Sequence, residues 1–216
     1  MSKYVIADIH GRIDALNEVI LKSGFQKEKD LLIVLGDIVD FGMGVRECID
    51  YVLSLPKKIV IMGNHDYWFL NWVLTGNILY DWRYQGGEAT LKSYNNDIHC
   101  VPVEHIKLIR EALFFYLDEK NRLFLHGGYN TTIPIENQDP YSLLWDRTIV
   151  QIAAYETIPI YSQVFIGHTR TQMLKSDVPV QLHNLTMCDT GAGRDGFLSI
   201  INVDTLEFWQ SERQNY

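Results

Sequence analysis

Short apolar runs and amphipathic stretches alternate along the first third of the chain. Three runs are almost continuously apolar, as is typical of parallel strands buried on both faces: 4–7, 31–35 and 58–62. Between them, 12–23 and 45–55 place apolar residues on one helical face, and Gly24 and Pro56 are expected to end these two helices. The pattern therefore predicts a βαβαβ unit built on a parallel sheet.

The remaining two thirds are predicted to add helices first and strands later. The middle of the chain is expected to hold, in order, a helix, a loop-rich segment and a second helix: 66–74, 76–97 and 104–117. Three further apolar runs each precede a polar residue: 123–125, 164–166 and 185–188. The segments 197–203 and 206–209 flank a short turn and predict an antiparallel hairpin. No repeat or linker interrupts the pattern, so a single domain over 1–216 is expected.

Composition and charge narrow the class of protein. The sequence is 47% hydrophobic and carries 19 Lys+Arg against 27 Asp+Glu, a net charge of -8. An acidic surface repels phosphate backbones and disfavours a nucleic-acid partner. No apolar run approaches the roughly 20 residues that cross a bilayer, and the first strand pattern leads straight to Asp8, so neither a membrane nor a secretory signal is expected. With Cys48, Cys100 and Cys188 odd in number and widely spaced, a cytoplasmic location is predicted.

Side chains that bind metals follow several of the predicted strands. Five segments combine such a residue with glycine or with another ligand: 8–11, 36–40, 63–66, 126–128 and 167–169. Open α/β sheets place their sites at the carboxyl ends of strands, where these segments are expected to meet. Asp8 and His10 are alternate residues, and in an extended chain their side chains would point to the same side.

Each of these residues taken singly has a plainer explanation as an incidental or structural polar group. Six of them at strand ends favour a site for two divalent cations, which need carboxylate, imidazole and amide ligands. The six candidate ligands are Asp8, His10, Asp37, Asn64, His126 and His168.

The order of these segments resembles the calcineurin-like metallophosphoesterase superfamily. The matched pattern is D-x-H, G-D-x-x-D, G-N-H-D, H-G-G and G-H-T, followed by D-T-G-A from Asp189. Position 170 is Arg where other branches carry a second His, and in this respect the chain is similar to the phosphoprotein (serine/threonine) phosphatase branch. The segments 82–94 and 143–147 resemble small bacterial and phage-type phosphatases. The resemblance implies an α/β fold: a mixed β-sandwich flanked by helices in four layers, α/β/β/α.

The resemblance also implies a role for each residue of the site. It assigns one cation to Asp8, His10 and Asp37, and the other to Asp37, Asn64, His126 and His168. A hydroxide bridging both cations is expected to attack phosphorus, with His65 as general acid. Asp40 would orient the His65 imidazole and favour its charged form, and the less favoured alternative for Asp40 is a carboxylate that caps the helix before Val45. Arg147 and Asn64 are assigned to substrate binding.

One position departs from the pattern of the phosphatase branch. That branch carries Arg after the second Asp of G-D-x-x-D, whereas this sequence has Phe41. Phe cannot replace the two parallel hydrogen bonds that a guanidinium gives a phosphate. Arg147 is then the matched phosphate ligand, and an aromatic ring at the rim slightly favours an aromatic or nucleoside leaving group.

The first interpretation is a hydrolase of phosphomonoesters, acting on phosphoserine or phosphothreonine in a phosphorylated protein or on a small phosphoester. The alternative is a diadenosine tetraphosphatase-like hydrolase that cleaves a nucleotide phosphoanhydride. A second alternative is a non-catalytic scaffold with the same fold, although such scaffolds usually lose ligands and this chain has all six together with His65. Mn²⁺ is the expected cofactor, two ions per chain, and Fe or Zn²⁺ would suit the same N and O ligands.

Overall fold

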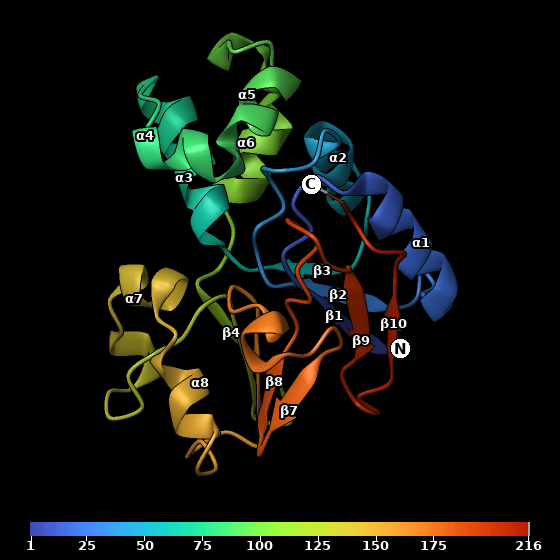
Figure 1. Ribbon diagram of the computed structural model, residues 1–216, viewed down its shortest axis with the longest axis vertical. Coiled ribbons are helices and arrows are strands. Elements are labelled where there is room, and N and C mark those ends of the chain that lie inside the picture. Colours follow the sequence, from blue (N-terminus) through green and yellow to red (C-terminus); the bar gives the residue numbers. More distant parts are fainter. Residues whose placement is uncertain (216) are drawn as a thin grey trace.

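The apolar runs of the sequence become the central strands of two five-stranded mixed sheets that pack face to face (Figure 1). The computed structural model describes residues 1–215. The strands are β1 (Lys3–Ile6), β2 (Leu31–Val34), β3 (Lys58–Val60), β4 (Phe115–Leu117), β5 (Arg122–Leu125), β6 (Gln163–Ile166), β7 (Val180–Leu182), β8 (Leu185–Met187), β9 (Ser199–Asn202) and β10 (Phe208–Gln210). The first sheet has the order β10-β9-β1-β2-β3 and the second β4-β5-β6-β8-β7.

Helices cover the outer face of each sheet. The α-helices are α1 (Ile13–Ser23), α2 (Val45–Leu53), α3 (Asn64–Thr75), α4 (Tyr80–Trp82), α5 (Glu88–Ser93), α6 (Val103–Arg110), α7 (Pro140–Trp145) and α8 (Thr148–Ala153). A π-helical turn, η1 (Arg83–Gly87), joins α4 to α5, and three short 3-10 turns are η2 (Ile98–Cys100), η3 (Ile135–Asn137) and η4 (Thr171–Leu174). The four-layer α/β/β/α fold implied by the resemblance is confirmed. No helix among residues 1–215 combines the length and apolarity that a membrane span requires.

The alternation of side chains along β1 shows why its sequence is apolar throughout. Tyr4 and Ile6 point to the helical layer, whereas Val5 belongs to the cluster between the two sheets. In that central layer Phe124 and Phe165 from neighbouring strands of the second sheet stack with ring centroids 4.9 Å apart. A strand that is buried on both faces needs apolar residues at every position.

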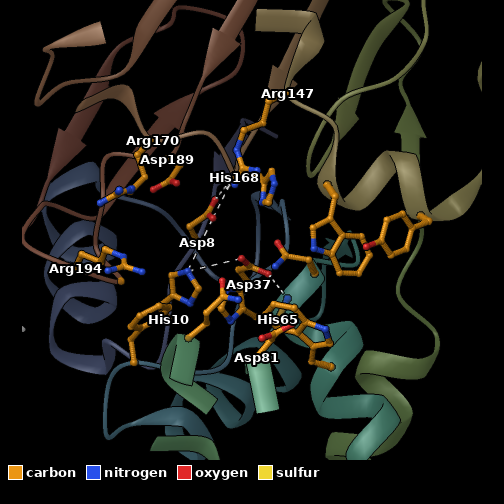
Figure 2. A pocket seen from close by; sticks show the side chains of 17 residues that line it. Asp8, His10, Asp37, His65, Asp81, Arg147, His168, Arg170, Asp189 and Arg194 are labelled. Atoms are coloured by element: carbon orange, nitrogen blue, oxygen red, sulfur yellow. Dashed lines mark hydrogen bonds and ion pairs between the residues drawn. The ribbon is translucent and has the colours of Figure 1, made fainter. Parts of the chain in front are cut away.

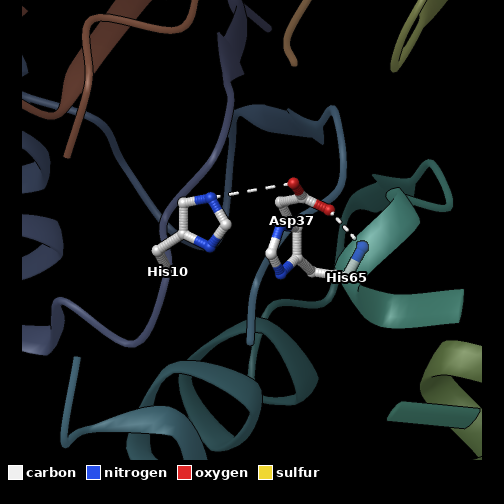
Figure 3. Close-up of side chains that lie close together, drawn as sticks. All are labelled: His10, Asp37 and His65. Atoms are coloured by element: carbon white, nitrogen blue, oxygen red, sulfur yellow. Dashed lines mark hydrogen bonds and ion pairs between the residues drawn. The ribbon is translucent and has the colours of Figure 1, made fainter. Parts of the chain in front are cut away.

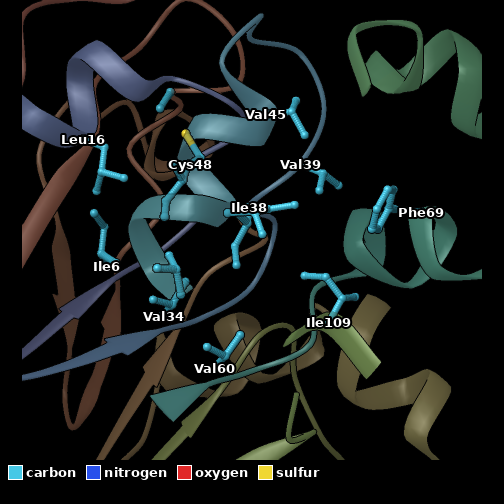
Figure 4. Packing of buried hydrophobic residues seen from close by; sticks show 14 of the residues in the cluster. Ile6, Leu16, Val34, Ile38, Val39, Val45, Cys48, Val60, Phe69 and Ile109 are labelled. Atoms are coloured by element: carbon cyan, nitrogen blue, oxygen red, sulfur yellow. The ribbon is translucent and has the colours of Figure 1, made fainter. Parts of the chain in front are cut away.

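The helical layer over the first sheet packs on the strands that lead to the predicted site (Figure 4). Ile6 and Val34 from β1 and β2 contact a cluster that includes Leu16 of α1, Cys48 of α2 and Phe69 of α3. This cluster fixes the helices relative to the strand ends. The strand-to-helix loops at these ends therefore have a rigid support on either side.

The structure differs from the sequence prediction mainly in the middle of the chain. The segment 76–97, predicted to be loop-rich, contains α4, η1 and α5, and Trp82 within it is fully buried. The predicted helix 104–117 ends at Arg110, and its last three residues form β4, which pairs with β5 in antiparallel register. Both predictions failed because tertiary packing overrides local periodicity in short segments.

Candidate functional site

The polar residues that follow the strands meet at one edge of the two sheets. They line a cavity of about 400 Å³ (Figure 2). The cavity is lined by Asp8, His10, Asp37, Asn64, His65 and His168, and the fully buried His126 has its ring centroid 5.0 Å from that of His168. All six predicted metal-ligating side chains are buried. The sequence prediction that these segments converge is confirmed.

A left-handed backbone, not a continued strand, brings the side chains together. β1 ends at Ile6, and Asp8 and His10 have φ values of 54° and 49°. The expectation that these two residues alternate along an extended chain is therefore wrong. Asp37 and His168 have φ values of 52° and 60° in the same way. Non-glycine residues rarely adopt this conformation, and such strain concentrates at functional sites.

Glycine precedes two of the ligand residues because the chain has no room for a side chain there. A Cβ atom at Gly63 would overlap Oδ1 and the backbone nitrogen of Asp37. A Cβ atom at Gly167 would overlap Oδ2 of Asp8. These glycines allow neighbouring loops to approach until carboxylates and imidazoles share one space.

His10, Asp37 and His65 form the first group of atoms that could hold a cation (Figure 3). Nδ1 of His10 donates to the carbonyl oxygen of Val39 across 2.8 Å, so its Nε2 carries a lone pair. That Nε2 lies 3.7 Å from Oδ2 of Asp37 and 4.0 Å from Oδ1 of Asp8. His65 thus lies in the group in which the resemblance had placed Asp8.

Asp37, His126 and His168 form the second group. Nδ1 of His126 donates to the carbonyl oxygen of Leu35 across 2.6 Å, which leaves Nε2 to face the cavity. Nε2 of His126 is 2.9 Å from Oδ1 of Asn64 and 3.4 Å from Oδ2 of Asp37. Three atoms with lone pairs therefore converge, and either a proton on Nε2 or a cation must separate them.

Asp37 is the residue shared by both groups. Its Oδ1 accepts the backbone N–H of His65 at the start of α3 across 2.9 Å. Its Oδ2 is left to face His10 on one side and His126 on the other. The carboxylate therefore lies between the two groups, as a ligand common to two cations would.

The burial of the imidazoles matches the needs of metal ligands. Burial lowers the pKa of His10 to about 3 and the pKa of His168 to about 2, so both rings are neutral. Burial alone would lower the pKa of His126 as well, but the Asp37 carboxylate outweighs it and raises that pKa to about 10. Nε2 of His168 is buried without a hydrogen-bond partner among the described residues.

Two buried carboxylates of the cavity, Asp8 and Asp189, form no close ion pair with a lysine or arginine among residues 1–215. Burial raises the pKa of Asp8 well above its usual value, and the carboxylate of Asp189 adds to this effect. Burial likewise raises the pKa of Asp189 to about 6. Buried carboxylates are costly unless they are paired or bind a metal. The donor set and its unpartnered atoms thus fit divalent cations.

His65 is held by Asp40, which is itself held by residues from the middle of the chain. Nδ1 of His65 donates to Oδ2 of Asp40 across 2.6 Å. Trp82 Nε1 donates to the same oxygen across 2.8 Å, and the Thr90 hydroxyl donates to Oδ1. Sequence reasoning left the roles of Trp82 and Thr90 open. The likeness of the segment 82–94 to small phosphatases was the available signal.

Asp66 is another residue whose role sequence reasoning did not identify. Its carboxylate is fully buried and accepts the backbone N–H groups of Asp37, Ile38 and Gly63 across 2.7, 3.0 and 3.1 Å. It therefore fixes the loop after β2 against the loop after β3. Its place next to His65 in the G-N-H-D segment was the only indication in the sequence.

The walls of the cavity differ in chemistry. Arg147, Arg170 and Arg194 contribute guanidinium groups. Tyr141 and Trp145 stack at 4.1 Å between ring centroids, and Trp145 lies 6.0 Å from the half-buried Trp68. The sequence predicted Arg147 as a substrate ligand, whereas Arg170 and Arg194 were given no role in the site.

Comparison with known proteins supports the superfamily but not the branch. The profile of the calcineurin-like phosphoesterase family matches residues 1–182. A symmetrical bis(5'-nucleosyl)-tetraphosphatase of Buchnera aphidicola is 28% identical over 160 residues, which cover 72% of this chain and 50% of the relative. The chain thus spans about half the length of such curated relatives. The phosphoprotein phosphatase branch is not confirmed.

Solved structures share the fold at low sequence identity. A crystal structure provisionally named a diadenosine tetraphosphatase superposes with a TM-score of 0.76 at 16% identity, covering 98% of this chain and 93% of that one. A protein serine/threonine phosphatase from Saccharomyces cerevisiae superposes with a TM-score of 0.61 at 14% identity, and the superposition covers 100% of this chain and 80% of that one. At these identities the likeness describes the fold alone.

Proposed function

The chain belongs to the calcineurin-like phosphoesterase family, and we propose that it is a metal-dependent hydrolase that cleaves a phosphoanhydride bond in a nucleotide polyphosphate. The proposal rests on the relatives named symmetrical bis(5'-nucleosyl)-tetraphosphatase. It agrees with the alternative interpretation of the sequence better than with the first one. Because the relatives are about twice as long, the activity of this chain on its own needs a direct test.

Two divalent cations would be held by the buried ligands. The resemblance assigns the first to Asp8, His10 and Asp37, and the second to Asp37, Asn64, His126 and His168, all of which are buried. When bound, the cations supply Lewis-acid stabilisation of the phosphoryl oxygens and a nucleophile at neutral pH.

The protein's own contribution to the reaction is to place a proton and to orient the phosphate chain. His65 protonates the bridging oxygen that leaves when water adds across the P–O–P bond, so each phosphate fragment ends with a hydroxyl or its anion. Burial lowers the pKa of His65, but Asp37 and Asp40 outweigh it and raise that pKa. A cation on Asp37 would offset its share, which leaves Asp40 as the partner that keeps the imidazole protonated.

The aromatic wall supports a nucleotide substrate. Tyr141 is 60% exposed and stacks on Trp145, so its outer face is available to a planar group. A nucleobase presents such a face, and stacking of a base on an aromatic side chain is worth roughly 1–3 kcal/mol. A phosphorylated serine or threonine offers no ring for this wall.

A protein phosphatase activity is the second candidate, because the segment 143–147 with Trp145 and Arg147 resembles that branch. The two candidates are separated by kcat/KM for diadenosine tetraphosphate and for a phosphothreonine peptide, measured with Mn²⁺ present. We expect a preference of at least about a hundredfold for the dinucleotide, equivalent to ~2.7 kcal/mol. A preference for the peptide would overturn the proposal. If neither compound nor p-nitrophenyl phosphate is hydrolysed, the scaffold interpretation stands.

A further inference from the structure

A cation–π contact joins Arg194 to Phe41 at the rim of the cavity. The Cζ atom of Arg194 lies 5.4 Å from the centre of the Phe41 ring, and that ring lies 4.7 Å from the ring of His10. A guanidinium stacked on a ring keeps its N–H groups directed outward in its own plane. The contact therefore places a set of hydrogen-bond donors beside position 41, where the side chain has none.

The loop that carries Arg194 is fixed against the site. A Cβ atom at Gly193 would overlap the His10 ring, so the backbone of this loop lies directly on it. Arg12 donates from Nε to the carbonyl oxygen of Ala192 across 3.0 Å, and the Asp189 carboxylate accepts the N–H of Gly191 across 2.9 Å. The backbone that leads to Arg194 is thus held by contacts with Arg12, Asp189 and His10.

Three arginines line the cavity, and two of them, Arg147 and Arg194, lie on different sides of it. Figure 2 shows Arg194 beside His10 and Arg147 beside His168, with Asp8 between them in this view. Among residues 1–215, neither the Arg147 nor the Arg194 guanidinium forms an ion pair or a side-chain hydrogen bond. Arginines without a carboxylate partner inside a cavity are suited to a bound anion.

The cavity is also larger than a single phosphoryl group requires. Its volume is about 400 Å³, within the range of sites for whole small ligands. Asp81 lies at the far side from Arg147 in Figure 2 and would repel a phosphate there. The favourable course for a polyanion therefore runs between Arg147 and Arg194, across the metal-binding groups.

We propose that Arg194 binds a phosphoryl group next to the one that reacts, so that the site selects substrates with a chain of phosphates over phosphomonoesters. Arg147 and Arg194 then contact different phosphates of one chain. Only the identity of the terminal nucleoside rests on the function proposed above. The selection for a phosphate chain follows from the two arginines themselves.

The test uses p-nitrophenyl phosphate hydrolysis as the readout and two inorganic competitors, phosphate and tripolyphosphate, at a fixed concentration of free Mn²⁺. The variants are Arg194→Ala, Arg194→Lys and the control Arg110→Ala, which removes one exposed positive charge from α6 outside the cavity. In Arg194→Ala the Ki of tripolyphosphate should rise about 10- to 100-fold, the loss expected for a charged hydrogen bond, and the Ki of phosphate should change little. For Arg194→Lys the Ki of tripolyphosphate should lie between the values of the wild type and Arg194→Ala, and for Arg110→Ala it should equal that of the wild type.

Equal changes of both Ki values in Arg194→Ala, or no change of either, would overturn the proposal. The rise in melting temperature caused by tripolyphosphate gives a second readout, which should shrink in Arg194→Ala and persist in the control. If the wild type hydrolyses no nucleotide polyphosphate, the proposed function fails, but the Ki ratio still decides the role of Arg194.

Discussion

The Nδ1 atom of His65 lies 2.6 Å from Oδ2 of Asp40, and the side chains are 9% and 0% exposed. Since Nδ1 is engaged with this carboxylate, the opposite ring nitrogen is the one that can reach the cavity. The same ring belongs to a group of possible ligands with His10 and Asp37. Whether His65 acts through a proton or through a metal is therefore the first question for experiment.

His65→Asn should lower kcat by about 10²–10⁴-fold, the usual contribution of a positioned proton donor. The loss should be smaller for p-nitrophenyl phosphate than for phenyl phosphate, because p-nitrophenolate leaves more readily without a proton. Metal content measured by elemental analysis should stay at the wild-type value. A variant that loses metal would instead identify His65 as a ligand.

The matched control is His105→Asn. His105 is buried and lies 2.8 Å from Asp50 and 2.7 Å from the Tyr94 hydroxyl, so its ring also contacts a carboxylate but lies outside the cavity. Its replacement should lower the melting temperature and leave kcat unchanged. An equal loss of kcat in both variants would mean that the effect of His65→Asn is structural.

Asp66→Asn should destabilise the fold and disorganise the site at once. Asn offers one acceptor oxygen and one NH₂ group, so an N–H of Asp37, Ile38 or Gly63 would face a donor. A buried donor left without an acceptor costs about 1–3 kcal/mol, and urea unfolding should report a loss of this size.

Asp30→Asn is the comparison for Asp66→Asn. Asp30 is buried and accepts the backbone N–H groups of Ser2 and Gln26, the same chemistry at a turn far from the cavity. It should lower stability while the enzyme still binds Mn²⁺ with wild-type affinity. Asp66→Asn should weaken that affinity as well, and an unchanged affinity would contradict a role in shaping the loops.

The positions of the candidate ligands could be predicted because the sites of open α/β sheets lie at the carboxyl ends of the strands, and strand ends can be recognised in the sequence. Asp37 and Asn64 each follow an apolar run, and the ends of neighbouring parallel strands meet at one edge of a sheet. The same rule applied to His126 and His168 in the second sheet. The rule needs only the strand ends, so the left-handed backbone at Asp8 did not prevent a correct placement.

The supporting residues could not be predicted because their roles depend on contacts between distant segments. Thr90 lies 50 positions from Asp40, and nothing in the local sequence indicates that the two meet. Arg194 follows the glycine-rich segment 191–193, which is typical of a turn, and only the packing of Gly193 on His10 directs it to the cavity. The substrate class could not be predicted from the sequence either, since the metal-ligand segments are common to phosphatases and nucleotide hydrolases.

Cation binding should stabilise the fold through Asp37. A ligand that binds only the native state adds RT ln(1 + [L]/Kd), about 2.7 kcal/mol at a hundredfold excess over Kd. Mn²⁺ should therefore raise the melting temperature of the wild type. Asp37→Asn should abolish the rise because Asp37 belongs to both ligand groups, whereas Asp81→Asn, a cavity carboxylate outside both groups, should retain it. An equal rise in Asp37→Asn would contradict the shared-ligand assignment.

A buried ion cluster at the opposite end of the strands should contribute to the free energy of unfolding, and this contribution should be lost at acid pH. Asp118, between β4 and β5, is bonded to Arg122 across 2.7 Å and to Lys3 of β1 across 3.0 Å, so it ties the two sheets together. Burial alone would raise the pKa of Asp118, but the hydrogen bonds from Arg122 and Lys3 outweigh it and lower that pKa to about 2. As pH falls, the Asp118 carboxylate therefore becomes protonated at a lower pH in the folded state than in the unfolded chain.

This depressed pKa contributes stability that is complete above the unfolded value, about pH 4, and is lost as pH falls through about 2. The difference in free energy of unfolding between the wild type and Asp118→Asn should thus shrink by about 1–2 kcal/mol between pH 5 and pH 2. Glu119→Gln is the control, since Glu119 pairs with the same Lys3 from an exposed position and screening by water weakens such pairs. A difference that stays constant over this range would mean that Asp118 gains no stability from its charge.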